Sequence, residues 1–272
     1  MTLARDLTPA LHYARTHGLH ALILARGDDV IAEEFGDGFD AESVHPLYSG
    51  TKSFWGVTAL YARADGLLTL DESVADTIES WRADAWKRRV TPRMLLTLTA
   101  GFGFGGLGAS VPTYDRAIET PLRDEPGTRF TYGGIPLQVF GAVLARKLGA
   151  KTTPHDYLRE RVLDPAGVTV SRWRSLGDGT LPLPTGASMR ARDWLAYGRF
   201  ILARRHELDE CFEATPLNPR YGLAWWLGTD LFYASGSAGQ ALYVVPSLDL
   251  VAVHFAKSSS YRHEAFLKRL IA

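Results

Sequence analysis

The chain has 272 residues, 46% of them hydrophobic, and its 30 basic side chains are balanced by 30 acidic ones. This length is enough to bury one large core or two fused ones. A neutral balance gives no field that would attract nucleic acid or an anionic membrane, so neither is expected as a partner. The single cysteine, Cys211, can form neither an internal disulfide nor a thiolate metal cluster.

Targeting and cofactor signals are also weak. The first eighteen residues scatter charges and histidines and lack the apolar stretch of a secretory signal. No segment is apolar over the length that spans a bilayer. The eight histidines show no H-E-x-x-H pattern, and the glycine-rich segment 101–106 is a poor match to a nucleotide-binding loop. We therefore expect a soluble, cytoplasmic protein with no metal and no cofactor.

The apolar periodicity predicts helices and strands in a clear order along the chain. A helix over 5–16 precedes two apolar runs, 21–25 and 30–32, which surround Gly27-Asp28 and predict a β-hairpin. A series of helices is then expected over 49–64, 73–81, 92–97, 136–147, 154–162 and 191–204. Strands are expected over 221–227, 231–233, 241–245 and 250–255, and a last helix over 261–271.

Strands at both ends of the chain and helices between them predict an α+β fold. The N-terminal and C-terminal parts are expected to form one antiparallel β-sheet flanked by the terminal helices. A mainly helical region is inserted into it. We expect a single catalytic domain over 1–272, with an α/β lobe made of 1–48 and 206–272 and a helical lobe made of 49–205. Ligand sites tend to form in the cleft between two such regions.

Ser49-Gly50-Thr51-Lys52, at the start of a predicted helix, is the candidate catalytic centre. A serine hydroxyl needs a base to act as a nucleophile at neutral pH. Positions three apart share one helix face, so the Lys52 amine can reach the Ser49 oxygen. Burial would lower the pKa of Lys52 enough for it to accept a proton. Free N–H groups at the helix N-terminus near Ser49 could hold a developing oxyanion. A helix-capping serine followed by a solvated lysine is the alternative for this spacing alone.

Two further stretches carry candidate site residues. Tyr132, in Phe130–Gly134, lies on a loop before an apolar helix and could exchange a proton if a neighbouring ammonium lowered its pKa. Ser235 and Gly236 belong to a small-residue stretch, 234–240, just before a strand, where a substrate could lie against the strand edge. A buried structural tyrosine and an ordinary strand connection are the respective alternatives.

Together these stretches resemble the serine β-lactamase-like superfamily. The branch is the class C-like one, with DD-peptidases, family VIII esterases and nylon-oligomer (6-aminohexanoate-dimer) hydrolases. Segment 48–55 (YSGTKSFW) is similar to the family's S-x-x-K motif, and 125–149 contains a "PG-x-x-F-x-Y" helix lead-in. Segment 91–103 is similar to "LL-x-x-T-S-G", with Ala100 in the serine place. Segments 222–230 and 232–253 resemble the closing strands.

The resemblance implies a role for each matching residue. Ser49 would be the acylated nucleophile, and Lys52 and Tyr132 would share the proton transfers as a coupled pair. Backbone N–H groups of Ser49 and Ser237 would form the oxyanion hole. The chain departs from the family twice: Gly134 replaces the asparagine that often ends the tyrosine motif, and 234–236 (ASG) replaces K-T-G, so that a lysine is missing. Both departures argue against efficient hydrolysis of β-lactams or D-Ala-D-Ala peptides.

The expected function is therefore hydrolysis of an ester or simple amide through an acyl-enzyme, with weak or no β-lactamase activity. The partner is a small-molecule substrate, and the oligomeric state is left open. An acyltransferase of the same fold and a non-catalytic binding or regulatory protein are the alternatives. The candidates for an aromatic lining of the cleft are Phe102, Phe104, Tyr114, Trp225 and Trp226.

Overall fold

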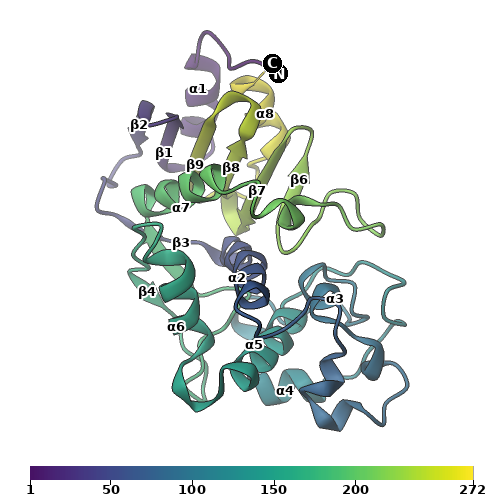
Figure 1. The fold of residues 1–272 in the computed structure, drawn as a ribbon. Helices are drawn as coiled ribbons and strands as arrows, with labels where there is room; N and C mark the ends of the chain where they lie inside the picture. Colours follow the sequence, from purple (N-terminus) through teal and green to yellow (C-terminus); the bar gives the residue numbers. More distant parts are fainter. Residues whose placement is uncertain (272) are drawn as a thin grey trace.

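A computed structural model describes residues 1–271, and a six-stranded antiparallel sheet forms the upper half of the molecule in Figure 1. The strand order is β2-β1-β9-β8-β7-β6, so β1 from the N-terminal part pairs directly with β9 from the C-terminal part. The predicted union of the two chain ends in one sheet is confirmed. The strands are β1 (Leu19–Arg26), β2 (Asp29–Phe35), β6 (Trp226–Gly228), β7 (Leu231–Gly236), β8 (Gln240–Val245) and β9 (Leu250–Ala256).

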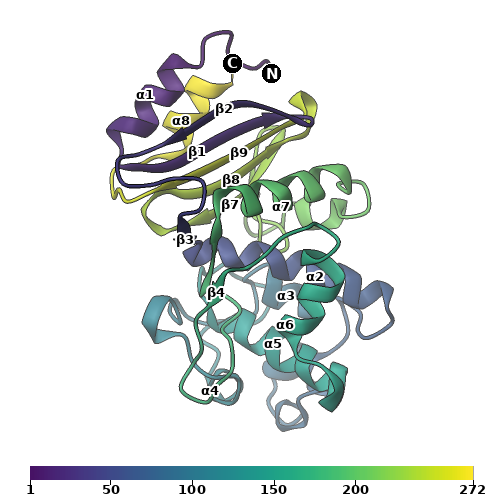
Figure 2. The same ribbon diagram turned by 90° about the vertical axis from the view of Figure 1, so that its left-hand side faces the viewer.

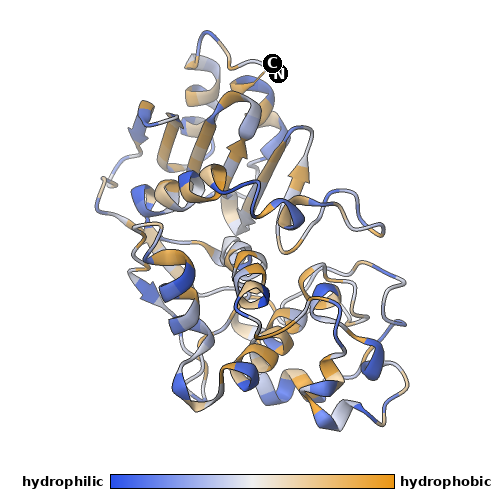
Figure 3. Ribbon diagram, viewed as in Figure 1, coloured by the Kyte–Doolittle hydropathy of each residue, from blue (hydrophilic) through white to orange (hydrophobic). Residues whose placement is uncertain are grey.

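Alternation along the central strands divides the apolar residues between two cores. Ala21, Ile23 and Ala25 of β1 belong to one cluster, whereas Leu22 and Leu24 belong to the other. Successive side chains of a strand point to opposite faces, so the sheet buries an apolar surface on both sides. Figure 3 shows the resulting concentration of apolar residues along the strands.

Helices cover both faces of this sheet (Figure 2). The terminal helices α1 (Thr8–Thr16) and α8 (His263–Leu270) pack together on one face, as predicted. The opposite face is covered by α7 (Ala191–Ala203), which contacts β1, β8 and β9. Although α7 lies within 49–205, the range expected for the helical lobe, it packs on the sheet. No helix of residues 1–271 is both long and apolar enough to cross a membrane.

The rest of the inserted region is mainly helical and lies on the α7 side of the sheet. Its α-helices are α2 (Ser53–Ala64), α3 (Pro92–Leu96), α4 (Tyr114–Glu119), α5 (Ile135–Leu148) and α6 (Pro154–Leu158). A second, three-stranded sheet was not predicted. Its order is β3-β5-β4, formed by β3 (Val44–Pro46), β4 (Arg172–Trp173) and β5 (Ala187–Arg190).

Two predicted elements were wrong in detail. The segment expected to form one helix over 73–81 forms two 3-10 turns instead. Val74 donates its backbone N–H to the Val90 carbonyl and the Ser73 hydroxyl donates to the Arg88 carbonyl, so the start of the segment bonds to residues 88–90 and not within a helix. Of the strand expected over 221–227, only the end enters β6. Ala224 has a φ of 62°, a left-handed conformation that interrupts a strand.

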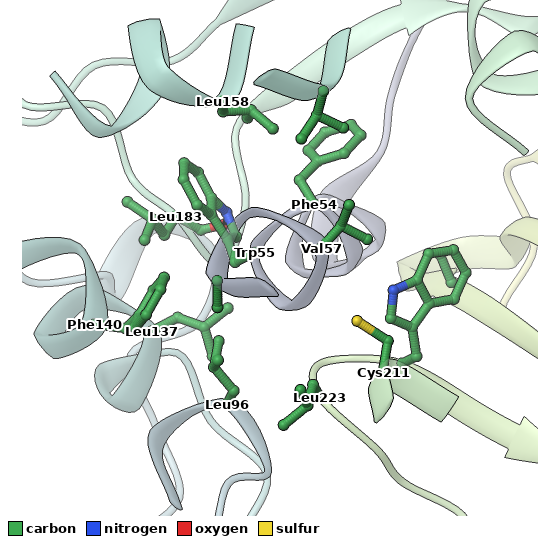
Figure 4. Packing of buried hydrophobic residues seen from close by; sticks show 14 of the residues in the cluster. Phe54, Trp55, Val57, Leu96, Leu137, Phe140, Leu158, Leu183, Cys211 and Leu223 are labelled. Carbon is green, nitrogen blue, oxygen red and sulfur yellow. Dashed lines mark hydrogen bonds between the residues drawn. The ribbon is translucent and has the colours of Figure 1, made fainter. Parts of the chain in front are cut away.

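Helix α2 lies inside the larger core, and buried apolar side chains from other segments surround it (Figure 4). At Gly56 the helix lies directly against another segment, since a Cβ there would lie 2.0 Å from the carbonyl oxygen of Leu223.

We expect Gly56→Ala to lower the free energy of unfolding by about 3 kcal/mol, because α2 would have to move away from Leu223. Urea denaturation measures this. Gly177→Ala is the matched control, since a Cβ at Gly177 meets open space. Equal stability of both variants would contradict the close packing.

Candidate active site

Ser49 and Lys52 lie in a 3-10 turn, η1 (Tyr48–Lys52), immediately before α2. A 3-10 helix has three residues per turn, so positions i and i+3 are stacked directly above one another. The Lys52 Nζ donates hydrogen bonds to Ser49 Oγ at 3.0 Å and to the Pro184 carbonyl at 3.2 Å. Tyr48, just before the serine, has a φ of 47°, a strained conformation for a non-glycine residue. The predicted contact between the serine and the lysine is present.

The environment of Lys52 suits a base. Its side chain is only 2% exposed, and this burial lowers its pKa to about 7 because the charged form loses its hydration. A large fraction of the amine is therefore neutral at physiological pH. The neutral nitrogen has a lone pair that can accept the Ser49 proton.

Tyr132 is the third member of the group. Lys52 Nζ lies 4.9 Å from the centre of its ring, and Trp226 stacks on the ring at a centroid distance of 5.5 Å. Burial raises the pKa of Tyr132, and its hydrogen bond with Ser49 offsets only part of the increase. Proton exchange at Tyr132 was predicted on the condition that a neighbouring ammonium lowered this pKa. Because burial dominates instead, the phenol stays protonated at neutral pH and can donate a hydrogen bond.

The loop that carries Tyr132 is fixed by backbone hydrogen bonds. Thr131 N–H donates to the Leu98 carbonyl at 3.0 Å, and Gly134 N–H donates to the Gly105 carbonyl at 2.9 Å. Gly105 and Gly133 also form an isolated parallel bridge. The glycine-rich segment 101–106 is thus a backbone partner of the tyrosine loop.

The end of β7 meets the chain that leads into η1. A Cβ at Gly236 would lie 2.1 Å from the Leu47 carbonyl oxygen, so only glycine permits this approach. Ser237 follows in an exposed turn, and the Gln240 side chain donates from Nε2 to the Ser237 carbonyl at 3.0 Å. Gln240 was not among the predicted site residues, although it stood in the matched G-Q pattern. An oxyanion hole made by the Ser49 and Ser237 N–H groups stays a prediction.

Ser235 is tied to a residue that the sequence analysis missed. Its hydroxyl lies 2.9 Å from His263 Nε2, and His263 Nδ1 lies 2.6 Å from the Tyr243 hydroxyl. Burial lowers the pKa of His263 to about 4, so this imidazole is neutral. His263 is 28 residues from Ser235 in sequence, and no local pattern links them. Ser235 therefore hydrogen-bonds to an uncharged imidazole, and Ala234, which stands in the lysine place of the related motif, supplies no ammonium.

The aromatic residues proposed for the cleft separate into several environments. Trp226 contacts Tyr132, but Phe102 and Trp225 are 2% and 0% exposed and belong to the core, which corrects their assignment to the lining. Tyr114 packs over Gly141 and lines a different cavity. Phe104 projects from the glycine-rich loop and is 78% exposed. An aromatic residue in a sequence does not reveal whether its ring faces the core or the cleft.

Two cavities flank the 181–185 segment. The larger, of about 1110 Å³, is lined by Leu181 and Tyr114 and includes neither Ser49 nor Lys52. The smaller, of about 490 Å³, is lined by Tyr48 and by Thr185. Thr185 follows Pro184, whose carbonyl oxygen accepts a hydrogen bond from Lys52. Neither Ser49 nor Lys52 lines the smaller cavity either, but its lining includes Tyr48, the residue that directly precedes Ser49 in the chain.

The fold is shared with several solved structures at low sequence identity. A candidate 6-aminohexanoate-dimer hydrolase from Bacillus anthracis has a TM-score of 0.77 and 17% identity, over 95% of this chain and 79% of that one. A D-stereospecific amidohydrolase from Streptomyces sp. has a TM-score of 0.72 and 15% identity, over 97% and 98%. EstCE1, a hydrolase with promiscuous acyltransferase activity, has a TM-score of 0.76 and 14% identity, over 96% of each chain.

At the level of sequence, no curated protein matches this chain. The family model described as Beta-lactamase, in contrast, matches residues 3–272, nearly the whole length. This agrees with the α+β architecture and with the resemblance of the three site segments. The chain belongs to the beta-lactamase family.

Proposed function

We propose that this protein is a serine hydrolase that cleaves a carboxylic ester or simple amide through an acyl-enzyme on Ser49. The observation that carries the proposal is the buried Lys52 amine, 3.0 Å from the Ser49 oxygen, with its pKa lowered to about 7. Pre-existing contact between a nucleophile and a neutral base is the arrangement that acyl transfer requires.

In the acylation step, the Ser49 oxygen forms a bond to the substrate carbonyl carbon while its proton passes to Lys52. Collapse of the tetrahedral intermediate breaks the bond to the leaving alcohol or amine. The protonated Tyr132 donates to that leaving group and recovers a proton from the Lys52 ammonium. Water then attacks the acyl carbon and gives a proton to the same pair. Collapse of this second intermediate breaks the bond to Ser49 Oγ, which takes that proton back as the acid leaves. The N–H groups of Ser49 and Ser237 would bind the oxyanion.

The substrate class follows from what the site lacks. Ala234 stands in the lysine place of the related motif and brings no cation, and Gly134 brings no side-chain amide. β-Lactams and D-Ala-D-Ala peptides would lose the contacts that these groups provide in related enzymes. Two of the similar structures are named as an amidohydrolase and as a hydrolase with acyltransferase activity, which is compatible with simple amides and esters.

A fluorophosphonate probe tests the proposal directly. We expect the probe to form one adduct, which peptide mass spectrometry places on Ser49, and to abolish turnover of p-nitrophenyl butyrate. Ser49→Ala should neither label nor turn over the ester, while Ser53→Ala, one turn away in α2, should still label. A protein that is folded but unlabelled and inactive on the ester would overturn the proposal and favour a binding role.

A further inference from the structure

The smaller cavity beside Ser49 has an unusual lining. Its floor is formed by the three-stranded sheet β3-β5-β4, and its volume is about 490 Å³. Pro46, Ser188 and Arg172 are aligned across that sheet, because Pro46 pairs with Ser188 and Ser188 pairs with Arg172. Arg174 continues the same side, and its backbone N–H donates to Gly186 at 3.0 Å.

The two arginines face the cavity and the residue between them does not. Successive strand residues point to opposite faces. Accordingly Arg172 and Arg174 line the smaller cavity, whereas Trp173 lines the larger one and packs against His155 at a centroid distance of 4.5 Å. The arrangement places both arginines in the lining of one cavity.

No carboxylate balances this charge. The residues that line the cavity include Arg172 and Arg174 and no aspartate or glutamate. Within residues 1–271, neither arginine forms an ion pair, and Arg174 gives one N–H to the Gly108 carbonyl at 2.8 Å. Two nearby arginines differ: Arg190 pairs with Asp193 and Glu42, and Arg192 pairs with Glu33. Apart from the N–H that Arg174 gives to Gly108, no hydrogen bond within residues 1–271 occupies the guanidinium groups of Arg172 and Arg174, and these groups can bind an anion.

The cavity is also close to the reacting atoms. Tyr48, in its lining, precedes Ser49, and Thr185, also in its lining, follows Pro184, whose carbonyl accepts a hydrogen bond from Lys52. We propose that Arg172 and Arg174 bind a carboxylate of the substrate, separated from the scissile carbonyl by a short chain. This inference rests on the proposed function, since it names the substrate class of the same site. The guanidinium fork is well suited to a carboxylate.

Kinetics with matched esters tests the inference. Mono-p-nitrophenyl glutarate carries a free carboxylate, and p-nitrophenyl butyrate is a neutral ester of similar length. We expect the wild type to prefer the glutarate ester in kcat/KM, and the double variant Arg172→Gln/Arg174→Gln to lose about tenfold of that preference. Arg88→Gln, which removes an exposed charge on another surface, should keep the wild-type ratio. A ratio that is equal in all three proteins would overturn the inference.

A binding measurement separates the two proposals. Glutarate, titrated calorimetrically into Ser49→Ala, should bind, and the binding should be lost when Arg172 and Arg174 are also replaced by glutamine. Neutral glutaramide should not distinguish the two proteins. If the wild type hydrolyses neither ester but glutarate binding depends on the arginines, the hydrolase proposal fails and the anion site stands. If both esters are hydrolysed and glutarate does not bind, the anion site fails alone.

Discussion

Replacing Lys52 with methionine is expected to reduce kcat/KM for p-nitrophenyl butyrate by about 10³-fold, the contribution typical of a positioned general base. Methionine preserves the length and burial of the side chain and removes the nitrogen that accepts the Ser49 proton. In the wild type, kcat/KM should rise with pH through about 7 and then level off, because the amine becomes neutral over that range. Stopped assays between pH 5 and 9 measure both effects.

The stability of the same variant provides the control. The pKa of Lys52 is about 7 in the folded chain and near its ordinary value of 10.5 in the unfolded chain. Between these values the unfolded state binds more protons, so this residue makes the free energy of unfolding rise with pH. Below pH 7 both states are protonated and the buried charge is fully unfavourable. Lys52→Met should therefore be more stable than the wild type at pH 6, and this advantage should shrink toward pH 10.

A less stable Lys52→Met would show that the hydrogen bonds to Ser49 and Pro184 outweigh the desolvation of the ammonium. Unchanged ester hydrolysis in a folded Lys52→Met would remove the lysine from the mechanism altogether. If Lys52→Met loses activity and gains stability, the lysine serves the reaction and lowers the stability of the fold.

The candidate site was predictable from sequence where spacing along the chain determines contact. Ser49 and Lys52 are one turn apart, so their meeting follows from local geometry. The sheet was predictable because short apolar runs separated by turn residues, at both ends of the chain, are typical of strands that share one core. Contacts such as Ser235 with His263, or the pair Arg172 and Arg174 beside Tyr48, depend on tertiary packing, and nothing in the local pattern encodes them.

The burial of a side chain was harder to predict from the sequence than the helix or strand that carries it. Phe102, Trp225 and Trp226 are equally aromatic, but two are buried in the core and one stacks on Tyr132. The direction of the pKa change at Tyr132 was also unpredictable, because it depends on how completely the ring is buried beside Lys52 and Trp226. The desolvation of a side chain depends on the whole folded structure, whereas two charged residues close in sequence can be recognised from the sequence itself.

The absent asparagine of the tyrosine motif has a packing explanation. A Cβ at Gly134 would lie 1.9 Å from the Gly106 carbonyl oxygen and 3.0 Å from Pro184 Cγ. The Gly106 carbonyl, in the glycine-rich loop, therefore occupies the space that the Cβ of any side chain at position 134 would need. Space is also limited around Gly106 itself, since a Cβ there would lie 2.7 Å from Ile135 Cγ1.

We therefore expect Gly134→Asn to fail as a restoration of β-lactamase chemistry. The substitution should lower the free energy of unfolding by about 3 kcal/mol through overpacking. Any displacement of Pro184 would also disturb the carbonyl that holds Lys52, so ester hydrolysis should fall and nitrocefin hydrolysis should not appear. Urea denaturation and both assays measure this, with Gly177→Asn as a control in open space. A stable Gly134→Asn that hydrolyses nitrocefin would mean that the missing amide, and not the position of the loop, limits the substrate range.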